Sequence, residues 1–179
     1  MLRAASALVV VVMVALAGCT GARDASGPSC GGNSPSATRT VAAWAEARND
    51  AEPRAFAAQF TEDATLEDLA LRVAYRGKEG ALAWASATHE HIRDAHVEVL
   101  EVFQRCDHVS VRWMLSGSAT TGKPGEEAAA GPSFSVPVTT VLELRDGKIA
   151  SESDFYDAAE LDSQLGRSPT TRPGHPPAR

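Results

Sequence analysis

The chain has 179 residues and a net charge of −6, from 17 Lys and Arg against 23 Asp and Glu. Its length suits one ordinary domain with additional segments, and 44% hydrophobic with 22% charged residues is a globular composition. The acidic balance lacks the basic surface of a nucleic-acid binder, so we expect no nucleic acid as a partner. The three cysteines form neither a CxxC pair nor a Cys/His cluster, and we therefore expect no metal site.

Residues 1–18 have the pattern of a secretory signal peptide. Arg3 precedes an uncharged apolar run from Ala4 to Ala17, which is shorter than the ~20 apolar residues needed to span a bilayer. The run ends in Leu16-Ala17-Gly18-Cys19, which resembles a bacterial lipobox. That resemblance implies cleavage before Cys19, a diacylglycerol on its thiol, and tethering to the extracytoplasmic face of a membrane. A plain signal peptide and an uncleaved anchor are the alternatives.

The composition then divides the rest of the chain into three parts. Residues 19–37 are rich in Gly, Ser, Pro and Asn, which predicts a flexible tether after the lipidated cysteine. Residues 167–179 hold four Pro, three Arg and no acid, which predicts a disordered tail. We expect the folded domain over residues 38–166.

The number of cysteines fits export to the extracytoplasmic side of the membrane. With Cys19 lipidated, Cys30 and Cys106 remain as an even pair in an oxidising compartment. A disulfide between Cys30 and Cys106 would join the tether to the domain. Since Cys30 lies in a flexible stretch, free thiols are the alternative.

Within the domain, helical patterns come first and strand patterns follow. We expect a helix capped by Thr38 or Thr40, a short helix from Pro53, a strand at 64–69, a turn at 75–77 and a helix at 78–92. Two strands at 97–103 and 109–115 come next, followed by a Gly-rich loop at 117–131. Two further strands at 134–145 and 148–156 complete the domain. Asp146-Gly147 between the last two strands is a strong hairpin signal, because both turn residues must tolerate φ > 0. This order predicts an α+β domain with one curved, mainly antiparallel sheet and helices on one face.

The last hairpin predicts which side chains share a face. A two-residue turn would pair Leu144 with Ile149, Val141 with Glu152 and Thr139 with Asp154, and directly opposed residues share a face. One face would then be apolar and carry Phe134, Val136, Val138, Leu142, Leu144, Ile149 and Phe155. The other would be mixed and carry Thr139, Val141, Glu143, Ala150, Glu152, Asp154 and Tyr156. The mixed face is either solvated or the polar floor of a pocket.

Several stretches together resemble SnoaL-like proteins. They are Phe60–Asp68 with Gly77-Lys78-Glu79-Gly80, Val111-Arg112-Trp113 with Gly117 and Gly122, Leu144–Ile149, Asp154-Phe155-Tyr156-Asp157 and Gln164-Leu165-Gly166. The resemblance covers about residues 40–166 and implies the nuclear transport factor 2-like fold, a cone of curved sheet and helices around an apolar cavity. This superfamily includes polyketide cyclases, ketosteroid isomerases, limonene-epoxide hydrolases and non-catalytic binders, so the fold alone leaves the function open.

The family's chemistry needs a carboxylate in a dry pocket, where burial raises its pKa towards neutrality. The resemblance makes Asp154 the first catalytic candidate, because epoxide-hydrolase relatives carry an Asp in a similar stretch. Asp157 is the second, near the position used by cyclase relatives, and its alternative role is the N-cap of a helix over 158–165. Glu152 is the third, on the same predicted face as Asp154.

Epoxide hydrolysis fits the residues less well. Those relatives use an Arg-x-Asp on the central strand, whereas here Arg112 is followed by Trp113 and Met114. A methionine cannot orient a water molecule or protonate an alkoxide. The reaction would need Glu67 or Asp68 from the first strand as a substitute.

Five further residues are candidates for lining a ligand pocket. Tyr75 and Tyr156 could donate to a ligand carbonyl or lie at a sheet edge, and Trp113 lines either core or cavity. Asp68 and its neighbour point to opposite faces of a strand, so only one of them points inward. His89 and His91 lie about 200° apart around their helix, too far for a metal pair, and we expect one of them, such as His89, to face the cavity unless both are solvated.

Two functions from different classes follow. The first is a cofactor-free acid–base enzyme, of cyclase or isomerase type, acting on a small apolar molecule. The second is an extracytoplasmic lipoprotein whose cone binds a lipid, a metabolite or a partner without chemistry. No cofactor is implied by any motif. A homodimer through the outer face of the sheet is expected, because that surface is apolar and relatives often pair there.

Overall fold

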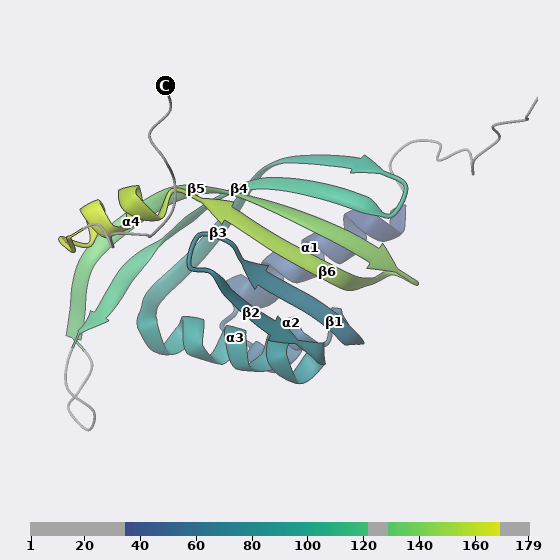
Figure 1. The fold of residues 1–179 in the computed structure, drawn as a ribbon, viewed down its shortest axis with the longest axis horizontal. Coiled ribbons are helices and arrows are strands. Elements are labelled where there is room, and N and C mark those ends of the chain that lie inside the picture. Colours follow the sequence, from purple (N-terminus) through teal and green to yellow (C-terminus); the bar gives the residue numbers. More distant parts are fainter. Residues whose placement is uncertain (1–34, 122–128, 169–179) are drawn as a thin grey trace, which may run out of the picture.

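A computed structural model of the chain describes residues 35–121 and 129–168. The elements, in chain order, are α1 (Pro35–Asn49), α2 (Pro53–Ala57), β1 (Phe60–Asp68), β2 (Val73–Arg76), α3 (Gly77–His91), β3 (Ile92–Arg105), β4 (His108–Thr121), β5 (Ala129–Arg145), β6 (Lys148–Tyr156) and α4 (Ala158–Gln164). The strands form one sheet in the order β2-β1-β6-β5-β4-β3, in which β1 and β6 are parallel and the other neighbours antiparallel (Figure 1). The predicted α+β architecture is confirmed.

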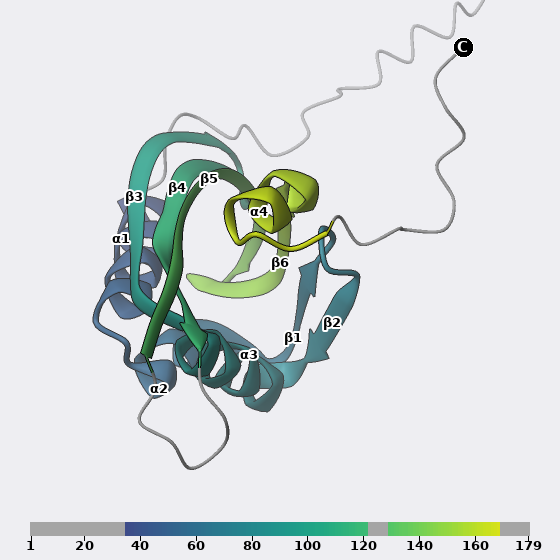
Figure 2. The same cartoon turned by 90° about the vertical axis from the view of Figure 1, so that its left-hand side faces the viewer.

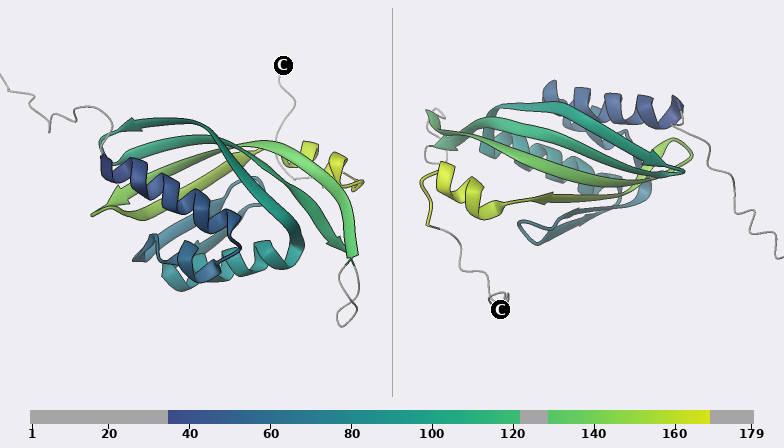
Figure 3. Two further views of the ribbon diagram at one scale, coloured as in Figure 1. Left: turned by 180° about the vertical axis from the view of Figure 1, so that it is seen from behind. Right: turned by 90° about the horizontal axis from the view of Figure 1, so that it is seen from above.

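The sheet is strongly curved, and the helices pack on its concave side. In Figure 2 the long strands β3, β4 and β5 bend around α4, while α3 lies beside their lower ends. Figure 3 shows α1 running along the sheet, with its start at the end of the molecule opposite to α4. Trp44 of α1 and Phe56 of α2 are fully buried in the core against inner-face residues such as Trp113 and Leu142. The predicted cone of curved sheet and helices is therefore the observed shape.

The first helix begins earlier than its predicted caps. α1 starts at Pro35, and proline is favoured in the first turn of a helix because its missing N–H has no intrahelical acceptor there. Thr40 lies inside the helix, and its hydroxyl donates to the carbonyl of Gly147 at 2.9 Å. Thr40 thus ties α1 to the last hairpin, and the predicted domain start at residue 38 falls inside α1.

A short strand replaces the predicted turn at residues 75–77. β2 pairs with β1 through Leu66 opposite Tyr75, and α3 begins directly after it at Gly77. Gly77 has φ = +68°, and a Cβ there would lie 2.8 Å from the carbonyl oxygen of Glu62. A glycine therefore lets the chain pass from strand to helix without a loop.

The strands around the Gly-rich segment are longer than predicted. Gly117 lies within β4, opposite Phe134 of β5, so both strands extend into the predicted loop at 117–131. Several sequence predictions fall outside the described residues: the signal peptide at 1–18, Cys19, Cys30, Gly122 and most of the tail at 167–179.

The last hairpin contains a β-bulge. Because of it the predicted face is wrong for the residues of β6 from Glu152 onward, while it is right for Ile149 and for residues 134–145. The turn is the expected one, with Asp146 and Gly147 at φ = +54° and +75° and Leu144 opposite Ile149. The register then shifts between Leu144 and Glu143, so that Glu152 pairs with Leu142 and Asp154 with Thr140.

A one-residue shift moves side chains to the other face of a strand. Glu152 and Asp154 consequently point to the buried, concave face, at 0% and 3% exposure. Val141 and Phe155 lie on the convex face instead, at 39% and 46% exposure. Glu152, Asp154 and Tyr156 thus leave the predicted mixed face, and the two acids lie among the apolar residues of the core.

Further exposed apolar side chains lie on the edge strand β3. They are Val99, Leu100, Val102 and Phe103. This surface is compatible with the expected homodimer, which stays a prediction. None of the helices in the described ranges is long and apolar enough to cross a membrane.

Candidate functional site

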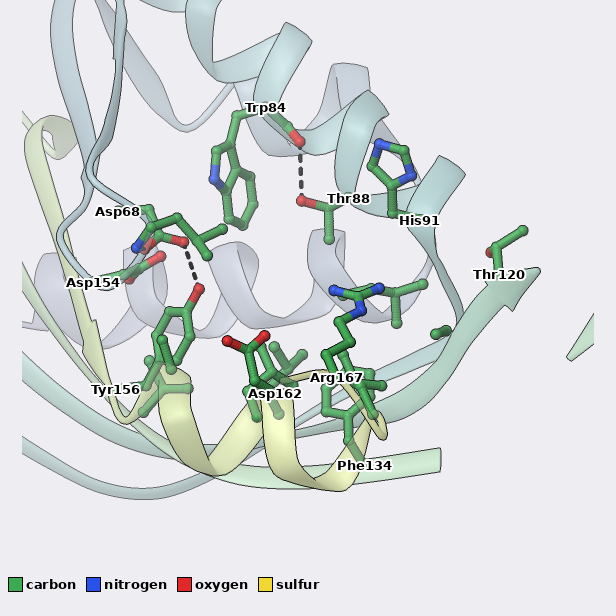
Figure 4. A pocket seen from close by; sticks show the side chains of 18 of the residues that line it. Asp68, Trp84, Thr88, His91, Thr120, Phe134, Asp154, Tyr156, Asp162 and Arg167 are labelled. Carbon is green, nitrogen blue, oxygen red and sulfur yellow. Dashed lines mark hydrogen bonds between the residues drawn. The ribbon is translucent and has the colours of Figure 1, made fainter. Parts of the chain in front are cut away.

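A cavity of about 450 Å³ lies between the concave face of the sheet, α3 and α4 (Figure 4). This volume is within the range of small-molecule sites, about 300–1,000 Å³. Its wall is largely apolar and includes Leu71, Trp84, Ile92, Trp113, Leu115, Phe134, Val138, Leu161 and Leu165. The polar lining residues are Arg48, Asp68, Thr88, His91, Thr120, Asp154, Tyr156, Asp162 and Arg167.

Asp154 presents one carboxylate oxygen to this cavity. Its Oδ1 accepts a hydrogen bond from Thr140 Oγ1 at 2.5 Å, and Thr140 Oγ1 in turn accepts from Trp113 Nε1 at 2.8 Å. Its Oδ2 forms a buried ion pair with Nη2 of Arg48 at 3.6 Å. Burial raises the pKa of Asp154, while the Arg48 guanidinium opposes that rise. One oxygen is thus held by Thr140 and the other lies beside the guanidinium.

Glu152 holds Arg48 in place. Its Oε1 forms a buried ion pair with Nη2 of Arg48, and its Oε2 accepts from Trp44 Nε1 at 2.9 Å. Burial raises the pKa of Glu152 to about 8, against the lowering effect of the Arg48 guanidinium. Glu152 does not line the cavity, and both of its oxygens are occupied, so its role is to position Arg48.

Arg48 lies in a box of four aromatic rings. Its Cζ is 4.3 Å from the ring centroid of Trp44, 4.4 Å from Trp84, and 5.0 Å from both Phe56 and Trp113. Its Nε is buried without a hydrogen-bond acceptor among the described residues. Burying an N–H group without an acceptor costs free energy, and cation–π attraction between the guanidinium and the ring faces offsets part of that cost.

A third carboxyl group lies beside Asp154 on the neighbouring parallel strand. Asp68 is opposite Asp154 in the β1–β6 register, and it is buried. Its Oδ2 accepts from the hydroxyl of Tyr156 at 2.9 Å and its Oδ1 from the backbone N–H of Leu71 at 2.7 Å. The negative charge of Asp68 adds to the rise in the pKa of Asp154. Two buried carboxyls thus contact the Arg48 guanidinium, and the buried Asp68 lies beside one of them.

A match to a known protein family shows to which family the chain is related. A family model of the SnoaL-like domain matches residues 41–152. The chain belongs to the SnoaL-like family. No curated protein sequence shows a significant match to it.

Solved structures share this SnoaL-like fold. One is a protein of ketosteroid isomerase-like fold from Catenulispora acidiphila DSM 44928, in complex with trimethylamine. It is 28% identical, with a TM-score of 0.66, and the match covers 79% of this chain and 100% of that one. TsrD from Streptomyces laurentii is 22% identical, with a TM-score of 0.62 and coverage of 75% and 97%. A candidate SnoaL-like polyketide cyclase from Jannaschia sp. CCS1 is 21% identical, with a TM-score of 0.64 and coverage of 77% and 99%.

Four of the predicted site residues meet in the SnoaL-like cavity: Asp68, Trp113, Asp154 and Tyr156. Two predicted lining residues do not line it. Tyr75 lies on the edge strand β2 and packs against the core. His89 lines a separate small cavity behind Trp84, where burial and then the charge of Arg48 lower its pKa, and His91 lines the main cavity instead.

The sequence analysis missed Arg48. Arg48 was not among the predicted site residues. It lies four positions after Trp44 and seven after Val41, both of which are buried. A charge on the apolar stripe of a helix is rare unless it is paired, and this was the available signal.

Asp157 is a helix cap and does not line the cavity. Its Oδ1 accepts from the backbone N–H groups of Ala159 at 2.9 Å and Glu160 at 3.2 Å. The catalytic assignment of Asp157 is therefore corrected to its alternative role. We expect Asp157→Ala to lower the free energy of unfolding by about 1 kcal/mol, because the first turn of α4 loses its acceptor. Denaturant unfolding measures this, and an unchanged midpoint would contradict the cap.

Cys106 forms a disulfide in the structure. The chain has only Cys19 and Cys30 as other cysteines, and both lie outside the described residues. The pairing of Cys106 with Cys30 stays a prediction. Among the described residues, no group of three or more His, Cys, Asp or Glu side chains is arranged to hold a metal ion.

Proposed function

We propose that this protein carries out cofactor-free acid–base chemistry, of cyclase or isomerase type, on a small and largely apolar molecule. Asp154 is the group that takes up and returns the proton. The observation that carries the proposal is a buried carboxyl group in the cavity wall, with a short hydrogen bond from Thr140 at one oxygen and the Arg48 guanidinium beside the other. A general base must have an oxygen within reach of the proton it removes.

The surroundings of Asp154 suit this role. Thr140 and Trp113 fix the carboxyl through two successive hydrogen bonds, so its other oxygen is pre-oriented. Burial raises its pKa, which makes its carboxylate a stronger base than an exposed aspartate. The Arg48 guanidinium counteracts that rise in the pKa of Asp154.

The proposed step balances as a proton transfer. The Asp154 carboxylate removes a proton from a carbon next to a carbonyl, and the C–H electron pair moves into an enolate. In an isomerase the protonated Asp154 returns the proton to a different carbon. In a cyclase the enolate carbon attacks a second carbonyl of the same molecule, and the proton goes to the new alkoxide.

A second candidate is a ligand-binding lipoprotein without turnover. The relative from Catenulispora acidiphila holds trimethylamine, which supports a binding role for this kind of fold. The lipobox-like Leu16-Ala17-Gly18-Cys19 supports anchoring through Cys19 on the extracytoplasmic face of a membrane. Anchoring is compatible with either candidate, so turnover is what separates them.

Exchange of α-protons on 2-tetralone, a compact bicyclic ketone, tests the proposal. The full-length protein in mild detergent is incubated with the ketone in D2O, and loss of the α-proton signal is followed by NMR. We expect exchange faster than in buffer, rising with pH to a plateau as Asp154 ionises, with a midpoint above the ordinary aspartate pKa of about 3.9. Retention of the ketone without faster exchange would favour the second candidate. A ketone that is neither retained nor exchanged would count against both.

A further inference from the structure

We propose that the indole N–H of Trp84 binds an oxygen atom of the ligand opposite Asp154. The cavity then recognises a neutral molecule with a hydrogen-bond acceptor next to the proton that Asp154 removes. This inference rests on the proposed function and adds to it a specificity-determining residue.

The three tryptophans of the chain differ in their N–H partners. Trp44 Nε1 donates to Glu152 at 2.9 Å and Trp113 Nε1 donates to Thr140 at 2.8 Å. Trp84 Nε1 has no acceptor in residues 35–121 and 129–168, although Trp84 lines the cavity. A tryptophan N–H in a half-buried position usually finds a partner, so an unmatched one in a cavity wall indicates a ligand acceptor.

The Trp84 ring is held in one orientation. It stacks on Phe56 at a centroid distance of 5.4 Å and an interplanar angle of 26°, and the guanidinium of Arg48 lies 4.4 Å from its centroid. Figure 4 shows the indole projecting into the cavity with its nitrogen on the side of Asp68. A donor whose position is fixed before binding stabilises a developing charge without reorganisation.

The other hydroxyl donors near this end of the cavity are already used. The Tyr156 hydroxyl donates to Asp68 at 2.9 Å, and the Thr88 hydroxyl donates to the backbone carbonyl of Trp84 at 2.9 Å. The guanidinium of Arg48 also lines the cavity, but it is paired with Glu152 and Asp154. Trp84 Nε1 is the neutral donor on this wall that remains for a ligand carbonyl oxygen. When Asp154 removes the neighbouring proton, negative charge moves to that oxygen and strengthens the hydrogen bond.

The test compares two ligands of the same shape, 2-tetralone and the hydrocarbon tetralin, by equilibrium dialysis against the full-length protein. Wild type should retain the ketone better than tetralin, because a ligand without oxygen leaves the N–H unsatisfied. Trp84→Phe should lower ketone affinity roughly fivefold relative to tetralin, the value of one net hydrogen bond. Thr88→Val is the matched control, since it removes a hydroxyl from the same wall that is already engaged.

A second variant separates the N–H from the ring. Replacing Trp84 with benzothienylalanine keeps the bicyclic shape and substitutes sulfur for the N–H, so the ketone preference should fall as in Trp84→Phe. If both variants lower the affinity for ketone and for tetralin by the same factor, Trp84 contributes only shape to the cavity wall and the inference is overturned. Wild type that prefers tetralin would overturn it as well.

The outcomes separate this inference from the proposed function. If wild type exchanges α-protons while the ketone preference is unaffected by the Trp84 variants, the role of Trp84 fails and the function of Asp154 stands. If the Trp84 variants lose the ketone preference but wild type does not exchange protons, the ligand class is supported and catalysis fails.

Discussion

Replacing Asp154 with Asn is expected to lower the rate of α-proton exchange on 2-tetralone by at least about 100-fold, the usual contribution of a general base. The amide has nearly the shape of the carboxyl, and its oxygen can still accept the hydrogen bond from Thr140. It cannot take up a proton at the position of Oδ2. Retention of the ketone, measured by dialysis, should persist, so the loss appears in the rate and not in binding.

Asp157→Asn is the matched control. It makes the same chemical change three residues away, at the cap of α4, where Asn is about as good an N-cap as Asp. Exchange and stability should both stay at the wild-type level. Loss of exchange in Asp157→Asn with full exchange in Asp154→Asn would move the base to the strand end and refute the assignment.

Replacing Arg48 with Met is expected to lower the free energy of unfolding by about 3–5 kcal/mol, because it leaves Glu152 and Asp154 buried without their cation. The flexible methionine fills much of the aromatic box, so the main loss is electrostatic. Chemical denaturation at neutral pH measures it. A loss below about 1 kcal/mol would show that the guanidinium does not compensate the buried acids.

Two further variants make the comparison specific. Arg145→Met removes an arginine of an exposed ion pair with Asp63, and it should lower stability much less than Arg48→Met because solvent screens exposed pairs. Arg48→Met combined with Glu152→Gln should recover part of the loss, because the glutamine needs no counter-charge. Additive losses in the double variant would mean that the two side chains stabilise the fold independently.

The loss of stability caused by Arg48→Met should change with pH, in a direction that follows from the raised pKa of Glu152. In wild type, burial raises the pKa of Glu152 from 4.5 to about 8, so the folded protein keeps a proton between these values that the unfolded chain has released. The contribution of this carboxyl to stability is therefore fully present below about pH 4.5 and falls as the pH rises towards 8. The guanidinium opposes that rise in pKa, so Arg48→Met should raise the pKa of Glu152 further and extend the decline in stability to higher pH.

Much of the fold was predictable from local pattern. The Asp146-Gly147 turn, the strand over 148–156 and the helix near 78–92 appear in the structure almost as predicted. Turn residues that tolerate positive φ and apolar periodicity act over a few residues, so they are visible in a single sequence. The resemblance to SnoaL-like proteins rested on several short stretches between residues 60 and 166, and the match over residues 41–152 confirms the family.

The environment of the carboxyl groups was not predictable in this way. Regular alternation from the turn placed Glu152 and Asp154 opposite Val141 and Thr139, and one bulge reversed their face. Asp157 directly follows the half-buried Tyr156, which donates to Asp68, and it has the local role that its position before α4 already suggested. The bulge depends on how β6 pairs with both β1 and β5, and those contacts are distant in sequence.

The sequence by itself determined the family, the order of the elements and the presence of Asp154 among the candidate acids. Only the tertiary structure decided that Arg48 lies beside Glu152 and Asp154, because the first and last thirds of the chain meet there across 104 residues. It also decided that Trp84 has an unmatched N–H in the cavity wall. Residue types follow from the sequence, but burial, charge balance and free hydrogen-bonding groups arise from packing between distant segments.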